Sequence, residues 1–278
     1  MSDMPLVSVI ITTKNEEKVL EGLLLSLKQQ AYSHTELIIV DNNSGDATKQ
    51  IALSYTSKVF NKGPERSTQR NYGAKKAQGT YYLFLDADMT LSDSVITECI
   101  KLVQSQKKIK AVVIPEKSIG TGFWSQCKAL ERQCYVGDVT LEAARFFEKK
   151  VFWKMGGYDE TITGPEDWDL PQKISRQYRI GRIKSLIYHH EGRITLARLA
   201  QKKYYYGQKV APYIAKHPLT TTTQQVVYLL RPALYRNWKL LVKKPLFALG
   251  MVIMLSVEQL AGFWGFLCGK KRLCKKVM

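Results

Sequence analysis

Short apolar runs alternate with helical patterns through the first part of the chain. Residues 7–12 (VSVIIT) are nearly all apolar, which is typical of a parallel strand covered on both faces. Residues 37–40 (LIIV) and 81–85 (YYLFL) repeat this pattern, and an aspartate follows each of them. Between the first two runs, one helical stripe carries Val19, Leu20, Leu23, Leu24 and Leu27. The repeat of strand, loop and helix predicts an α/β fold with a mostly parallel central sheet flanked by helices.

Polar residues suggest where the helices begin. Asn15 is suited to cap the first helix, with Glu16 and Glu17 in its first turn. A second helix is expected near Asp46, and residues 71–77 are expected to form a third. Open α/β sheets bind ligands at the carboxyl ends of their strands, so the polar residues that follow the strands are candidates for a site.

The pattern changes in the last quarter of the chain. Residues 226–242 mix apolar, aromatic and basic side chains, and residues 245–268 then run for roughly 24 positions with Glu258 as the only charge. That length is about what a helix needs to span a bilayer. We therefore predict a catalytic domain over residues 1–218 and basic, apolar membrane-associated helices over residues 219–278.

Basic clusters flank this apolar stretch, at residues 243–244 and 270–276. Because basic residues beside a membrane segment favour the cytoplasm, we expect an interfacial helix followed by a re-entrant hairpin that keeps both clusters inside. Glu258, which is costly in hydrocarbon, and the glycines between residues 262 and 269, which permit close packing or a bend, favour the same interpretation. A single span and a long core helix are the alternatives.

Charge and cysteine content narrow the partners and the compartment. Residues 1–172 contain 21 Lys and Arg against 22 Asp and Glu, whereas residues 173–278 contain 21 against 2. The basic excess indicates a polyanionic surface, either nucleic acid or an anionic membrane. The five cysteines form no C-x-x-C pair, and the first residues lack the pattern of a signal peptide. We therefore expect the chain at the cytoplasmic face of the membrane.

Asp86 and Asp88 form a D-x-D pair directly after the run at residues 81–85. Residues two apart in an extended segment point to the same side, so both carboxylates can face one ligand. Carboxylates suit Mg²⁺ or Mn²⁺, and phosphates of a nucleotide would complete the metal's shell. An isolated D-x-D is also common as a plain acidic turn, so its context matters.

That context is an ordered set of four segments: VSVIITTKNEE, LIIVDNNSGDAT, QRNYGAKKAQGTYYLFLDADM and GGYDETITGPEDWDL. Together they resemble the family 2 inverting glycosyltransferases over roughly residues 5–210. The resemblance implies a GT-A-like, Rossmann-type fold and transfer of a sugar from a nucleotide-diphosphate sugar. It also implies the site residues. Those of the donor pocket are Thr13, Glu16, Asp41, Arg70 and Asp86.

The resemblance also implies which residues carry out the chemistry. Asp86 and Asp88 would be the metal motif, and Asp167 would be the catalytic base. His189 or His190 would touch the metal or the diphosphate, and we select His189 as the metal ligand.

Each assignment has a plainer alternative. Thr13 and Glu16 could cap the first helix, Asp41 could serve only a turn, and Arg70 could pair with a surface acid. Asp167 could belong to the acidic first turn of a helix through residues 168–174. Asp169 is the second choice of base, and either histidine could simply end a strand.

The expected reaction joins an acceptor oxygen to the anomeric carbon while the diphosphate leaves from the opposite face. A metal neutralises the departing group, and a carboxylate takes the acceptor proton. The Q-x-x-R-W segment of processive synthases is missing, since QYRIG at residues 177–181 does not match it. Transfer of a single sugar to a hydroxyl of a membrane-bound glycolipid or polysaccharide precursor is therefore predicted, with polyprenyl phosphate as the alternative acceptor.

Three rival classes fit less well. A nucleic-acid-binding protein would use the basic tail but would leave the ordered acids unexplained. A sugar nucleotidyltransferase would need a Gly-rich loop where TTKNEE stands. A membrane scaffold with a degenerate transferase domain is disfavoured, because Asp86, Asp88 and Asp167 are intact. We expect no nucleic-acid partner.

Overall fold

The computed structural model describes residues 4–138, 140–217 and 225–277, and its contacts divide the chain into two compact units. The first, here named the sheet unit, comprises Met1–Glu116, Ala143–Glu160 and Glu166–His190. The second, the helical unit, comprises Lys117–Glu142, Thr161–Pro165 and Glu191–Met278. The domain boundary expected at residue 218 lies outside the described residues and stays a prediction.

A seven-stranded sheet forms the centre of the sheet unit, with the order β3-β2-β1-β4-β8-β6-β9 within the described residues. The strands are β1 (Val7–Thr13), β2 (Thr35–Asp41), β3 (Val59–Asn61), β4 (Tyr81–Asp86), β6 (Ile109–Val113), β8 (Ala144–Glu148) and β9 (Arg179–Arg182). β1 pairs in parallel with both β2 and β4, while β8 is antiparallel to its neighbours β4 and β6. The expected mostly parallel α/β sheet is therefore confirmed.

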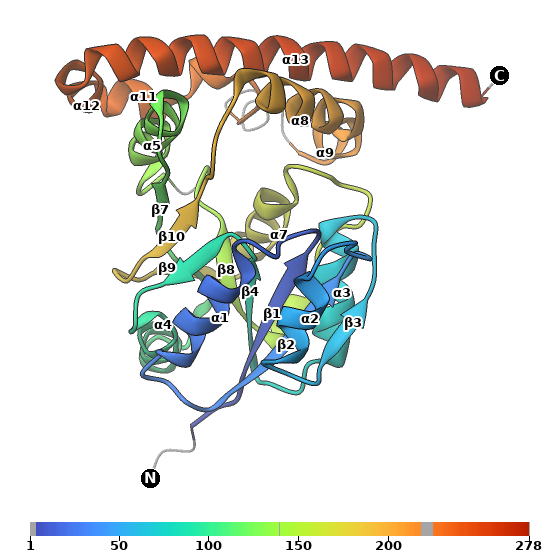
Figure 1. Ribbon diagram of the computed structural model, residues 1–278, viewed down its shortest axis with the longest axis vertical. Helices are drawn as coiled ribbons and strands as arrows, with labels where there is room; N and C mark the ends of the chain where they lie inside the picture. The colour runs from blue at the N-terminus through green and yellow to red at the C-terminus, as the bar shows by residue number, and fades with distance from the viewer. Residues whose placement is uncertain (1–3, 139, 218–224, 278) are drawn as a thin grey trace. The chain divides into compact units, whose positions relative to one another are not determined.

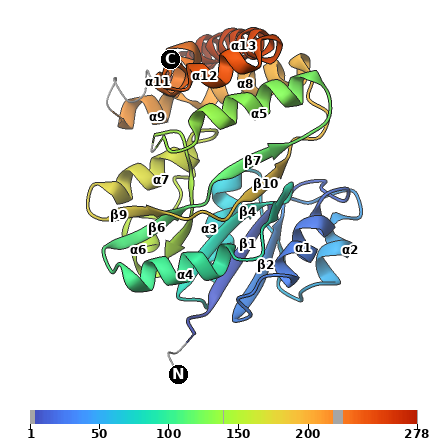
Figure 2. The ribbon, with the colours of Figure 1, turned by 90° about the vertical axis from the view of Figure 1, so that its left-hand side faces the viewer.

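Helices cover both faces of this sheet (Figures 1 and 2). One face carries α1 (Leu20–Lys28), α2 (Thr48–Leu53) and α4 (Val95–Ser105), and the other carries α3 (Arg66–Lys76), α6 (Lys149–Lys154) and α7 (Glu166–Ser175).

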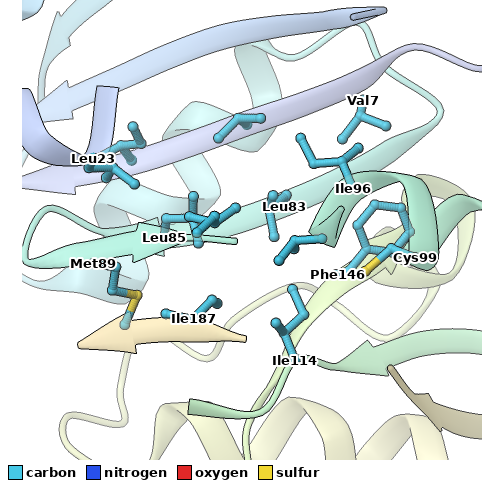
Figure 3. Close-up of a cluster of buried hydrophobic side chains, with 14 of the residues drawn as sticks. Val7, Leu23, Leu83, Leu85, Met89, Ile96, Cys99, Ile114, Phe146 and Ile187 are labelled. Atoms are coloured by element: carbon cyan, nitrogen blue, oxygen red, sulfur yellow. The ribbon is translucent and has the colours of Figure 1, made fainter. Parts of the chain in front are cut away.

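Alternate residues of β4 enter the two cores. Leu83 and Leu85 join the first core, which Figure 3 shows, and Tyr82 and Phe84 join the second. Burial on both faces explains why these strands are continuous apolar runs.

The register brings the polar strand ends together. Thr13 lies opposite Asp41, and Thr12 lies opposite Asp86, so three carboxyl ends share one edge of the sheet. Beyond this edge, β5 (Met89–Leu91) pairs antiparallel with β10 (Ile187–His190), and His189 lies opposite Met89. Strand pairing thus carries a residue from late in the chain to the D-x-D segment.

The helical unit is built around one long helix, α13 (Pro245–Val277), which packs on α5 (Phe123–Tyr135) and α8 (Leu196–Lys209) (Figure 1). Shorter helices complete the described part of this unit: α9 (Ala211–Lys216), η1 (Tyr228–Leu230), α11 (Pro232–Arg236) and α12 (Trp238–Lys243). A Cβ on Gly207 would come within 2.1 Å of the Gly262 carbonyl oxygen, and one on Gly265 within 2.1 Å of the Tyr204 carbonyl oxygen. The glycines therefore let α8 and α13 approach closely.

Two expectations about helices are wrong. The stretch from Pro245 is one continuous helix, so it forms no re-entrant hairpin; its glycines face a neighbouring helix and produce no bend. The part Pro245–Lys270 is long and apolar enough to cross a membrane. Asn15 does not cap the first helix, which begins at Leu20. Asn15 has a left-handed φ of 55°, and its side-chain oxygen accepts a hydrogen bond from the Gly45 amide.

Candidate active site

Three arginines surround Asp86 at the end of β4. Its carboxylate lies 3.0 Å from Arg70 Nη2, 3.5 Å from Arg145 Nη1 and 4.0 Å from Arg66 Nη1. Burial alone would raise the pKa of Asp86, but the three guanidinium groups outweigh it and hold the pKa far below the ordinary value of 3.8. Asp86 is therefore a fixed anion.

Arg70 connects Asp86 with the expected base. Its side chain is fully buried, and its Nη1 donates to Asp167 Oδ1 at 2.6 Å while its Nη2 donates to Asp86. The Tyr158 ring lies 5.0 Å from the guanidinium carbon. Arg66 stands one helical turn earlier on α3, so both arginines reach the same edge of the sheet.

A glycine turn fixes the loop that carries Tyr158. Gly156 and Gly157 have φ values of 87° and 68°, and a Cβ on Gly157 would come 2.8 Å from Asn71 Oδ1. Asn71 accepts from the Tyr158 amide and donates to the Tyr158 carbonyl oxygen. The QRN and GGYDE segments are thus locked together beside Arg70.

His189 bridges two carboxylates. Its Nε2 lies 3.0 Å from Asp88 Oδ2, and its Nδ1 lies 3.3 Å from Glu116 Oε2. The other oxygen of Glu116 accepts from Arg145 Nε at 2.6 Å. His190 instead faces Thr90 Oγ1, at 3.0 Å from its Nε2. The structure therefore brings His189, and not His190, to the D-x-D carboxylates.

These contacts form one continuous set, here named the Asp86 ion network. Its members are Asp86, Asp88, Glu116, Glu166, Asp167, Arg66, Arg70, Arg145 and His189. Five carboxylates face three guanidinium groups, which leaves two negative charges in excess when His189 is neutral. The most accessible carboxylates of the network are Asp88 and Asp167, whose side chains are 36% and 20% exposed. The network is therefore open to a cationic ligand.

Sequence reasoning missed four members of this network: Arg66, Glu116, Arg145 and Glu166. Arg66 had a signal, because it lies four residues before Arg70 on one helical face. Glu116 and Arg145 had none, since each is a single polar residue at a strand end with no motif around it.

The acids of the first turn of α7 differ in access. Asp167 keeps one oxygen clear of Arg70, whereas the Asp169 side chain is fully buried and pairs with Lys173 Nζ at 2.6 Å. Glu166 is also buried and lies 3.0 Å from Arg66 Nη2. Of the three, Asp167 has the most accessible side chain, which favours it over the buried Asp169 as the base, and that role stays a prediction.

Thr13 and Asp41 shape the loop at the edge of β1 and β2. Thr13 Oγ1 donates to Asp41 Oδ1 at 2.8 Å, and the Ser44 amide and hydroxyl donate to the same carboxylate. The Glu16 amide lies 2.7 Å from Thr48 Oγ1, within the turn before α1. Three of the five expected donor-pocket residues, Thr13, Glu16 and Asp41, thus lie near this edge, and the contact of all five with a nucleotide stays a prediction.

Residues 8–163 match Glycosyl transferase family 2. The chain belongs to this family. An uncharacterized glycosyltransferase of Haemophilus influenzae is 26% identical over 239 residues, which cover 79% of each chain. The poly(ribitol-phosphate) beta-N-acetylglucosaminyltransferase TarS of Staphylococcus aureus is 27% identical over 212 residues, which cover 73% of this chain and 35% of TarS.

A solved structure of another protein has a similar fold. The mannosyltransferase PcManGT of Pyrobaculum calidifontis, in complex with GDP-Man and Mn²⁺, superposes with a TM-score of 0.67 at 16% identity and covers 95% of this chain and 88% of its own. The expected GT-A fold and the expected class of glycosyltransferase are confirmed.

The residues present fit a divalent cation. Two adjacent ligands of an octahedral ion with bonds of about 2.1 Å lie about 3.0 Å apart. Asp88 Oδ2 and His189 Nε2 are separated by 3.0 Å, beside an excess of negative charge. Within the described residues no set of three acidic, histidine or cysteine side chains is arranged to hold an ion. Asp88 and His189 thus offer two ligands, which suits an ion that is shared with substrate phosphates. Binding of a metal by Asp86, Asp88 and His189 stays a prediction.

Proposed function

We propose that this family 2 glycosyltransferase transfers a single sugar, with inversion, from a nucleotide-diphosphate sugar to a hydroxyl acceptor. One observation carries the proposal: buried Arg70 binds Asp86 of the D-x-D segment and Asp167 of the EDW segment at once. This contact supports the proposal, because it connects the D-x-D segment, beside which the donor would bind, with the carboxylate that would take the acceptor proton.

Mg²⁺ or Mn²⁺ would be held by Asp88 and His189 together with the diphosphate of the donor. When bound, the ion supplies neutralisation of the charge that develops on the departing diphosphate. Asp86 contributes differently, because three arginines surround it and keep it ionised. Its role is to fix these arginines at the edge of the sheet, where the donor phosphates would lie.

Asp167 would act on the acceptor. As the bond from the acceptor oxygen to the anomeric carbon forms and the bond from that carbon to the diphosphate oxygen breaks, the hydroxyl proton passes to the free oxygen of Asp167. Arg70, at 2.6 Å, orients this carboxylate, and the Asn71 clamp on Tyr158 holds the neighbouring loop. A base positioned in this way is worth about 10²- to 10⁴-fold in rate.

The acceptor we favour is an anionic cell-envelope polymer or its membrane-bound precursor. The support is the likeness to TarS, whose name describes transfer to poly(ribitol phosphate). A polyprenyl phosphate is the second candidate, and it would need no base because it is already an anion.

We also propose attachment to the cytoplasmic membrane face through α13. One side of this helix packs on α5 and α8, and the other exposes large apolar side chains. These are Leu246, Leu249, Ile253, Leu260, Phe263 and Trp264. Their spacing follows one helical face, and exposed Lys243 and Lys244 precede it, as in helices that lie in the plane of an anionic membrane.

A screen of nucleotide sugars against the full-length protein tests the reaction. The correct donor with Mn²⁺ should raise the melting temperature, since a ligand at 100 times its Kd stabilises by about 2.7 kcal/mol. Slow metal-dependent hydrolysis of that donor should follow. Asp88→Ala should lose both responses. If no nucleotide sugar stabilises the protein with Mg²⁺ or Mn²⁺, the proposal fails.

A further inference from the structure

A basic hollow lies on the sheet unit, away from the Asp86 ion network. Its volume is about 570 Å³. Its lining residues are Lys107, Lys108, Lys110, Ser175, Arg176, Gln177, Tyr178 and Arg179. Five of these eight side chains are cationic and none is acidic or aliphatic. The composition indicates a site for an anion.

The fold explains where this hollow lies. The loop after α4 leads into β6, and the loop after α7 leads into β9, with Ile109 of β6 opposite Arg179 of β9 in a parallel pair. The hollow is therefore at the amino ends of these strands. β6 runs in the same direction as β4, because both are antiparallel to β8, so Asp86 lies at the opposite edge of the sheet. A five-residue strand separates these edges by about 17 Å.

Most of the positive charge in the hollow is not neutralised. Lys110 pairs with Glu148 at 2.5 Å. Within the described part of the chain, Lys107, Lys108, Arg176 and Arg179 form no ion pair. A concave surface lined by one sign of charge concentrates the field and attracts ions of the opposite sign.

Protection of a sheet edge does not explain all the cations of the hollow. β9 is an edge strand, and charged residues on such strands commonly prevent pairing with other chains. Only Arg179 belongs to β9, however, while the other unpaired cations come from loops. Tyr178 and Gln177 add an aromatic face and an amide, and Lys154 Nζ donates to Tyr178 Oη at 2.9 Å. Cations with an aromatic and an amide suit a ligand that carries both phosphate and hydroxyl groups.

We infer that this hollow binds a phosphate-bearing segment of an anionic sugar- or polyol-phosphate polymer, at a distance from the point of transfer. The inference deepens the proposed function, on which it rests for the identity of the polymer as acceptor. A ligand that reaches both edges of the sheet has to be long, and a polymer with repeating phosphates meets this need. A membrane surface is disfavoured because the hollow offers no aliphatic side chain for insertion.

The test measures binding of a short synthetic poly(ribitol phosphate) oligomer to the full-length protein by titration calorimetry, without donor or metal. The variant Lys108→Glu/Arg176→Glu reverses two exposed charges of the hollow. Its matched control, Lys49→Glu/Lys75→Glu, reverses two exposed charges elsewhere on the sheet unit. We expect the first variant to weaken binding at least about tenfold and the control to weaken it less than about twofold, with the difference reduced by salt.

Equal weakening by both variants, or no binding by the wild type, would overturn the inference. So would single-stranded RNA or phosphatidylglycerol vesicles that bind more tightly than the oligomer and lose as much affinity in the hollow variant. Melting curves of both variants check that they are folded. Because no turnover is measured, failure here leaves donor stabilisation by Mn²⁺ untouched, and the two proposals can fail separately.

Discussion

Two buried ion networks can be compared within this chain, one in each compact unit. In the sheet unit, Asp86 is surrounded by three arginines, and in the helical unit Glu258 lies 3.3 Å from Lys128 Nζ and 3.1 Å from Lys203 Nζ. The second network continues through Glu131, which lies 2.7 Å from Lys128 Nζ and 3.4 Å from Arg231 Nη1.

The networks differ in access and in charge balance. The acids of the helical unit are sealed, with side-chain exposures of 1% for Glu258 and 3% for Glu131, and three cations outnumber them. The Asp86 ion network has more acids than cations and exposes Asp88 and Asp167. A sealed network holds helices in place, whereas an open one with excess charge can accept a metal and a proton.

The largest effect is expected from Asp88→Ala. It removes an accessible acid that faces His189 at 3.0 Å, so turnover should fall at least about 10³-fold and donor binding should weaken. Initial rates with and without EDTA measure this effect. Full activity of the wild type in EDTA would refute the metal assignment.

A loss of stability of about 3 kcal/mol is expected from Glu258→Gln, because the partly buried Lys203 loses the anion at 3.1 Å and the partly buried Lys128 keeps only Glu131. Denaturant unfolding measures this change. The control is Glu148→Gln, which breaks the partly exposed pair with Lys110 and should cost below about 1 kcal/mol. Similar losses in both variants would show that the sealed network is not special.

Asp167→Asn should lower turnover by about 10²-fold or more, because the proton acceptor is lost. Donor affinity should change little, because the amide oxygen of Asn can still accept the hydrogen bond from Arg70 Nη1. Asp169→Asn should instead lower the melting temperature, since Asp169 is buried against Lys173. Steady-state kinetics and thermal unfolding of both variants separate the two roles. A nearly normal rate for Asp167→Asn would favour the polyprenyl phosphate acceptor.

The smallest effect is expected from Glu116→Gln. Glu116 orients His189 through Nδ1, so its loss should weaken Mn²⁺ binding about tenfold in the presence of donor nucleotide. Electron paramagnetic resonance of free Mn²⁺ reports this affinity directly. Thr90→Val removes the partner of His190 and should leave the affinity unchanged. Equal changes in the two variants would exclude a positioning role for Glu116.

Local patterns in the sequence determined much of this molecule. The runs at β1, β2 and β4 are apolar because both faces of the strands are covered, and that composition alone predicted the mostly parallel sheet. The position of Asp86 and Asp88 at a strand end followed from the same pattern. Composition also indicated a helical segment of spanning length from residue 245, but the continuous helix α13 was only an alternative to the re-entrant hairpin that we expected.

Only the tertiary structure decided which distant residues meet. Arg145 reaches Asp86 through the order of strands in the sheet, and Glu116 joins the network through Arg145 and His189. The pairing of β5 with β10 selects His189 over His190. The glycines of α13 suggested a bend in sequence, but α8 uses them for close contact. Local spacing fixes how a segment folds, whereas the partner of a side chain depends on register and packing between segments that are far apart along the chain.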